Sequence, residues 1–226
     1  MNTLNNWQSC EAPAPKELTG KLVQLTHFNF DEHTAPLWHA LGGEKANELI
    51  RFFPNGPYET STEFGNWLKE VNESKAFHTM IILSLKTQEI LGMASYMRCA
   101  PEHGSVEIGA IAHGPKMMRS PMATEAHYLL AKHIFDDLGY RRYEWKLNNE
   151  NEASHNAAKR LGFTFEGIFR QHMVAKGKNR DTAWYSMLDS EWPLNRDAFE
   201  TWLDKANFDI SGTQIKSLKE IKKRVI

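Results

Sequence analysis

Short runs of hydrophobic and polar positions along the chain predict an α+β protein. Runs with a period of two indicate strands, and runs with apolar residues three and four positions apart indicate helices. Strands are expected at residues 21–28, 77–85, 89–98, 105–112, 142–147, 163–175 and 182–188. Helices are expected at 31–41, from 61 or 62 to about 71, from 120 to a stop at 139, and at 151–161. This order is typical of an α+β layout with a mixed sheet.

The helix expected from residue 120 has the clearest start signals. Ser120 stands at the cap position and Pro121 at the first helical position. The preceding loop, residues 115–123, leads from a strand into this helix. Free N–H groups and the positive end of the helix can bind a pyrophosphate, and Lys116 and Arg119 add positive charge there. An ordinary strand-to-helix connection has the same spacing, so both interpretations stay open on spacing alone.

Composition and charge narrow the class of protein. The chain has 226 residues, of which 41% are hydrophobic and 24% charged, as in soluble globular proteins. A formal net charge of -1 gives no overall field that would attract nucleic acid or a membrane surface. No apolar run reaches the roughly 18 residues that span a bilayer, and no signal-peptide pattern is visible. We therefore expect a soluble cytoplasmic protein with no membrane and no nucleic acid as partner.

The chain is expected to form one main domain with an addition at each end. Residues 1–19 are polar and contain proline, which indicates an N-terminal arm. Residues 20–192 form the main domain, and residues 193–226 form a C-terminal helical extension. Near its end, apolar residues at helical spacing lie opposite a row of basic residues; the apolar residues are Ile215, Leu218, Ile221 and Val225. A nucleic-acid-binding tail is one interpretation, but the apolar stripe needs a partner and favours a helix packed on the domain.

Four motifs occur in an order that resembles a known enzyme family. They are IGAIAHGP at 108–115, RSPMATEA at 119–126, NEAS at 151–154 and LGFTFEG at 161–167. Together they resemble the GCN5-related N-acetyltransferase (GNAT) superfamily, and within it the ribosomal-protein N-acetyltransferase-like (RimJ/RimL) branch. The resemblance covers about residues 22–192 and implies α/β/α layers around a mixed, mostly antiparallel sheet of six to seven strands. It also implies an acetyltransferase domain at 20–192 that uses acetyl-coenzyme A as cosubstrate.

The resemblance implies a cofactor site built from two strands and a loop. A splayed strand pair, here 108–112 and about 145–147, would hold the pantetheine arm, and the loop at 118–123 would bind the pyrophosphate through its amides. Compared with the family pattern, Met118 replaces a polar residue and Pro121 a glycine. Proline has no N–H, so we expect weaker cofactor binding rather than none. The expected cofactor-binding residues are Ile111, Ala112, Met118, Arg119, Ser120, Met122, Ala123, Thr124 and Asn151.

Ser154 and Glu107 are the main candidates for catalysis. From the residues alone, Asn151 is a helix cap and Ser154 a first-turn residue. The family implies that Asn151 contacts the cofactor arm and that Ser154 protonates the departing thiolate. Glu107 shares a strand face with Gly109, which makes it the candidate base, although a charge paired across the sheet explains it equally well. His172 is the second candidate for the base, because its ordinary pKa suits that task.

The acceptor is expected to be an amine. An α-amine with a pKa near 7.7–8.0 is partly neutral at neutral pH, whereas a lysine near 10.4 must first lose its proton, so a protein or peptide N-terminus is favoured. A small-molecule amine and a non-catalytic acyl-coenzyme A-binding module remain alternatives.

Cys10 and Cys99 lie outside the motifs, which favours direct transfer in a ternary complex. No histidine spacing indicates a metal, and both a monomer and a homodimer are possible. Candidate acceptor-groove residues are His172 and three aromatic residues that also suit the core, Trp38, Phe53 and Tyr58.

Overall fold

The alternating segments form one eight-stranded sheet in the computed structural model, which describes residues 4–223. The strand order is β1-β2-β3-β4-β5-β6-β8-β7. Only the β5–β6 pair is parallel among these neighbours. The strands are β1 (Glu17–Thr19), β2 (Val23–His27), β3 (Phe77–Ser84), β4 (Ile90–Ala100), β5 (Ser105–His113), β6 (Arg142–Asn148), β7 (Thr164–Ala175) and β8 (Lys178–Leu188).

The expected α+β fold, with its mixed and mostly antiparallel sheet, is confirmed. The sheet has eight strands instead of six to seven because Glu17–Thr19, within the segment expected to be an arm, pairs antiparallel with β2. This edge strand is only three residues long, and so short a segment shows too little alternation to be recognised in a sequence.

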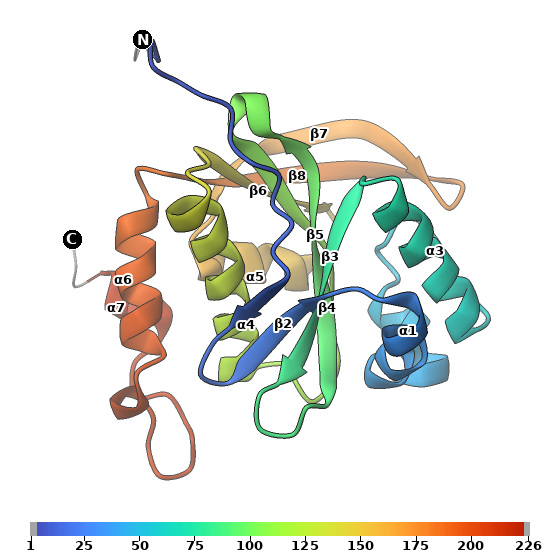
Figure 1. Cartoon of the computed structure of the whole chain (residues 1–226), viewed down its shortest axis with the longest axis horizontal. Coiled ribbons are helices and arrows are strands. Elements are labelled where there is room, and N and C mark those ends of the chain that lie inside the picture. Colours follow the sequence, from blue (N-terminus) through green and yellow to red (C-terminus); the bar gives the residue numbers. More distant parts are fainter. Residues whose placement is uncertain (1–3, 224–226) are drawn as a thin grey trace.

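Helices cover both faces of the sheet, as expected (Figure 1). Helices α1 and α3 lie on one side, and α4, α6 and α7 on the other. Each side has its own apolar cluster: one contains Leu37, Phe64 and Ile81, and the other contains Leu130 and Trp145. The helices are α1 (Phe30–Ala40), α2 (Ala46–Leu49), α3 (Ser61–Glu73), α4 (Pro121–Lys132), α5 (Glu152–Leu161), α6 (Trp192–Trp202) and α7 (Leu218–Lys222).

Both ends of the described chain pack on the sheet-containing part. Near the start, Trp7 Nε1 donates a hydrogen bond to the Glu102 carbonyl. Near the end, Leu218 and Ile221 of α7 are buried in the same apolar cluster as α4. Val225, the last member of the apolar stripe, lies outside the described residues. Within residues 4–223, no helix is long and apolar enough to span a membrane.

Candidate active site

Strands β5 and β6 separate after a short stretch of pairing. Their register runs from Ser105 opposite Arg142 to Ile108 opposite Trp145. Beyond these residues β5 continues to His113 and β6 to Asn148 with no further pairing between them. The facing edges of the two strands therefore leave backbone groups free to bind a ligand.

A bulge on the other edge of β5 accompanies this separation. Between two register points with β4, the single residue Ala94 lies opposite both Ala110 and Ile111. Ala110 has a φ of 45°, in the region that favours glycine. Such a bulge changes which face the following side chains occupy. Ala112 consequently belongs to the cluster on the α1 side, whereas Ile108 belongs to the cluster on the α4 side.

The loop after β5 holds the N-terminus of α4 next to the open strands. Gly114 begins this loop, and a side chain there would clash with the Ala40 carbonyl oxygen, so only glycine fits. The Ser120 hydroxyl donates to the Met117 carbonyl at 2.7 Å and does not cap the helix. The cap expected from the sequence is therefore absent, and the first-turn N–H groups of α4 remain available to an anion.

The structure narrows the set of amide donors expected in this loop. The amides of Met118 and Ser120 donate to the carbonyls of Gly114 and Met117. Thr124 is the fourth helical residue, where the N–H joins the helix ladder, and its side chain is buried. Those three residues are thus poor amide donors to a ligand. The donors that remain are the N–H groups of Arg119, Met122 and Ala123.

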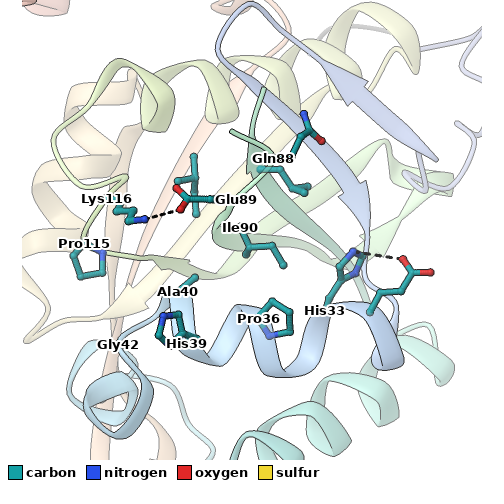
Figure 2. A pocket seen from close by; sticks show the side chains of 13 residues that line it. His33, Pro36, His39, Ala40, Gly42, Gln88, Glu89, Ile90, Pro115 and Lys116 are labelled. Carbon is teal, nitrogen blue, oxygen red and sulfur yellow. Dashed lines mark hydrogen bonds and ion pairs between the residues drawn. The ribbon is translucent and has the colours of Figure 1, made fainter. Parts of the chain in front are cut away.

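A groove of about 660 Å³ lies on the α1 side of the same loop, between α1 and the β3–β4 turn (Figure 2). Lys116 lines this groove and forms an ion pair with Glu89 at 2.9 Å. Its charge is therefore already paired, and Arg119 is the better candidate for pairing with a pyrophosphate.

Ser154 and Asn151 lie where the second open strand turns into α5. Asn151 caps α5, because its Oδ1 accepts a hydrogen bond from the Ser154 N–H at 3.2 Å. The Ser154 hydroxyl is half-buried and accepts a hydrogen bond from Trp145 Nε1 at 2.9 Å. The helix-cap interpretation of Asn151 is confirmed. The cap uses only the Oδ1 atom, so the Asn151 Nδ2 group has no hydrogen bond to any described residue.

Glu107 is committed to ion pairs across the sheet. Its carboxylate is 2.7 Å from Arg98 Nη1 on β4 and 3.2 Å from Lys146 Nζ on β6. Lys146 also pairs with Glu144 at 2.7 Å. Burial acts to raise the pKa of the Glu144 carboxyl, but the hydrogen bonds from Lys146 and Arg142 outweigh it, so that pKa is lowered. Both contacts use the Glu107 carboxylate as the partner of cations on the neighbouring strands. The geometry therefore favours the cross-strand pair over the base that we considered for Glu107.

The candidate acceptor residues fall into two groups. Tyr58 is held by the Asn47 side chain and lies against Trp67, and Phe53 lies against the same ring. Trp38 joins this aromatic group through Phe64. Among residues 4–223, no hydrogen bond or ring contact links His172 to that group. Instead, His172 Nδ1 lies 2.9 Å from Thr182 Oγ1, and its ring contacts Phe169 and Trp184.

The elements that carry these two groups nevertheless touch. Lys176, at the tip of the β7–β8 hairpin, donates to the carbonyl of Arg51 at 3.2 Å. Figure 1 shows the hairpin extending across the molecule toward α3. His172 and the aromatic group therefore lie on two elements that meet at the hairpin tip.

The hydrogen-bond and ion-pair partners of the site residues were not predicted from the sequence. Trp145 was expected to line the cofactor arm, but its hydrogen bond to Ser154 was not foreseen. The ion pairs of Arg98 and Lys146 with Glu107 were not predicted either. One signal was present, since Arg142, Glu144 and Lys146 alternate with buried residues and so mark a charged strand face.

The chain is similar to known acetyltransferases. Residues 25–164 match the family described as Acetyltransferase (GNAT) domain. The crystal structure of a GCN5-related N-acetyltransferase from Brucella melitensis is 43% identical, has a TM-score of 0.93, and covers 97% of this chain and 100% of its own. The uncharacterized N-acetyltransferase YoaA of Bacillus subtilis (strain 168) is 31% identical over 102 residues, which make up 45% of this chain and 57% of YoaA. The chain thus spans little more than half the length of that curated relative.

A ribosomal-protein acetyltransferase also shares the fold. The Salmonella typhimurium acetyl transferase that modifies the N-terminal serine of 50S ribosomal subunit protein L7/L12 is 19% identical, with a TM-score of 0.65 over 75% of this chain and 96% of its own. At this identity the likeness concerns the fold alone. The family match at 25–164 covers more than half of the chain, and the Brucella structure extends the likeness to nearly all of it. The chain therefore belongs to the acetyltransferase (GNAT) family, whose members are acyltransferases.

Proposed function

We propose that this protein is an N-acetyltransferase that transfers the acetyl group of acetyl-coenzyme A directly to a primary amine. The favoured acceptor is the N-terminal α-amine of a protein or peptide. The observation that carries the proposal is the separation of β5 and β6 next to an uncapped helix N-terminus. This arrangement suits a long amide-containing chain that ends in a pyrophosphate.

Residues on both open strands and at the helix start would hold the cosubstrate. Ile111 and Ala112 supply backbone groups on β5, and the free Nδ2 group of Asn151 can donate to the cofactor arm. The N–H groups of Arg119, Met122 and Ala123 would bind the pyrophosphate. When bound, acetyl-coenzyme A supplies an activated thioester.

The choice of acceptor depends on how readily the amine loses its proton. An α-amine is partly neutral at neutral pH and needs only a weak base, whereas a lysine side chain has to lose a proton that it holds about 3 pKa units more tightly. Since Glu107 is paired with two cations, an acceptor that needs no strong base fits this site better.

The direct test is turnover with a panel of amines. Purified protein is mixed with acetyl-coenzyme A and peptides, polyamines or small aminoglycosides, and free thiol is measured. We expect release with peptides that carry a free α-amine and none with N-terminally blocked ones. Release only with small amines would make the protein a small-molecule acetyltransferase. Tight cofactor binding without any turnover would support the non-catalytic acyl-coenzyme A-binding alternative, which the missing N–H of Pro121 keeps open.

Ser154 is the proposed donor to the departing sulfur. We expect Ser154→Ala to lower kcat at least tenfold and to leave cofactor affinity nearly unchanged, because the hydroxyl acts on charge that develops in the transition state. Ser61→Ala, at the start of α3, is the control and should retain wild-type kcat. Turnover that is unchanged in Ser154→Ala would reduce Ser154 to a helix-start residue.

Within the family we place the protein in the RimJ/RimL-like branch, on the four motifs quoted above. We also place it in the cytoplasm, since both Cys10 and Cys99 are free and free thiols persist in reducing compartments.

A further inference from the structure

The hydrogen bond between Trp145 and Ser154 has only one possible direction. An indole nitrogen donates and does not accept, so Ser154 Oγ must be the acceptor of the 2.9 Å contact. The Ser154 hydroxyl makes no other hydrogen bond within residues 4–223. Its own proton is therefore available to a further acceptor.

Both partners are held firmly in place. Trp145 is only 3% exposed. The His127 ring lies 5.2 Å from it, and Phe163 packs against it edge-on at 5.4 Å. Rings in contact with an indole on two sides fix its orientation. Ser154 is fixed by its N–H bond to Asn151.

The pair lies where the two strands separate. Trp145 is the last residue of β6 in register with β5, and Ser154 follows nine residues later in the first turn of α5. The side chain of Trp145 thus connects the point where β5 and β6 separate to Ser154, the serine proposed to act on the sulfur.

We propose that Trp145 is a positioning residue that orients the Ser154 hydroxyl toward the departing sulfur. This inference rests on the proposed function. As the amine nitrogen forms its bond to the acetyl carbon, the carbon–sulfur bond breaks and its electron pair moves to sulfur. Ser154 donates a hydrogen bond to that sulfur. The proton lost by the amine passes through solvent to the thiolate, so the products are an amide and a free thiol.

The imidazole in contact with Trp145 and the second imidazole in contact with that ring support this role because both are uncharged at neutral pH. Burial lowers the pKa of His127, and it lowers the pKa of His113, whose ring contacts His127, to about 4. Neither imidazole is therefore a cation that would compete for the sulfur at neutral pH. In such an environment, a serine oxygen that accepts a hydrogen bond becomes a better donor through its own O–H.

A double-mutant cycle tests the coupling. We expect Trp145→Phe to lower kcat about tenfold with little change in the KM for acetyl-coenzyme A, as the loss of one hydrogen bond predicts. In the Ser154→Ala background the same substitution should have almost no further effect. Trp202→Phe is the matched control, because Trp202 is also 3% exposed and donates to a neutral oxygen, that of Gln214. It should retain the wild-type kcat.

A second readout needs neither cofactor nor turnover. In ¹H–¹⁵N spectra, the indole N–H resonance that disappears in Trp145→Phe identifies Trp145. In Ser154→Ala, which keeps the tryptophan, we expect that resonance to move upfield and its hydrogen exchange to become faster. An unmoved resonance would show that the hydrogen bond is absent in solution and would overturn the inference.

The outcomes separate the inference from the proposed function. If Ser154→Ala is impaired and Trp145→Phe retains wild-type kcat, the inference fails and the proposed function stands. If Trp145→Phe lowers kcat equally in both backgrounds, its effect does not pass through Ser154 and the inference fails as well. If Ser154→Ala retains full kcat, the catalytic role of Ser154 fails first and the inference fails with it.

Discussion

Single charged residues on the sheet face opposite α4 are paired across neighbouring strands. Arg98 of β4, Glu107 of β5 and Lys146 of β6 form one continuous set of ion pairs. Lys146 and Glu107 are almost completely buried, with side chains 9% and 4% exposed. Buried charges persist only when each has a partner. Removing Glu107 leaves Arg98 without this partner and Lys146 with Glu144 alone.

We expect Glu107→Gln to destabilise the protein more than it slows the reaction. The loss of one partner in a buried pair should lower the free energy of unfolding by about 3 kcal/mol, measured by urea titration. The basic limb of the pH–rate profile should keep its shape, since Glu107 is not expected to accept the proton. Glu89→Gln, in the exposed pair with Lys116, is the control and should change the free energy of unfolding much less, because solvent screens exposed ion pairs. A flattened basic limb in Glu107→Gln would restore Glu107 as the base.

At the scale of elements, helices and strands with strong periodicity were predictable from the sequence. The features that shape the site depend on contacts between separate residues or strands, and these were not predictable. The bulge at Ala110 depends on the register with β4, which a single strand's pattern does not encode. The hydrogen bond from Trp145 to Ser154 crosses a turn, so no local spacing marks it. The missing cap of α4 has a similar cause, since Ser120 has a cap residue's identity but bonds back to Met117.

The uncapped start of α4 leads to a prediction about cofactor affinity. Pro121 occupies the first helical position and lacks an N–H, so Pro121→Ala adds a donor where the anion would lie. A hydrogen bond to a charged group contributes about 1.5 kcal/mol or more, so the Kd for coenzyme A should fall about tenfold in calorimetry. Pro193→Ala, at the second helical position of α6, is the control and should leave the Kd unchanged. An unchanged Kd in Pro121→Ala would place the pyrophosphate elsewhere.

At the scale of the whole molecule, two apolar layers enclose the sheet, and the α4 layer contains polar groups as well. His113 and His127 lie in contact within it, between β5 and α4. His113 Nε2 is buried without a hydrogen-bond partner among the described residues. A buried imidazole in this state is held neutral, because an apolar surrounding disfavours its charged form. Folding therefore excludes a proton that the unfolded chain would bind in mildly acidic solution.

Because of this exclusion, we expect the free energy of unfolding to decrease as the pH is lowered from 6.5 toward 4. The folded pKa of His113, about 4, lies below its ordinary value of 6.5. Its contribution is fully present above pH 6.5 and is lost progressively as the pH falls toward 4, because only the unfolded state is then protonated. At 1.36 kcal/mol per pKa unit, His113 alone should lower the free energy of unfolding by about 2 kcal/mol between pH 7 and pH 5. Urea titrations at the two pH values should show a smaller loss for His113→Gln than for the wild type, with some loss remaining from His127. His103→Gln, at an exposed histidine, should lose as much as the wild type, and an equal loss in His113→Gln would contradict the argument.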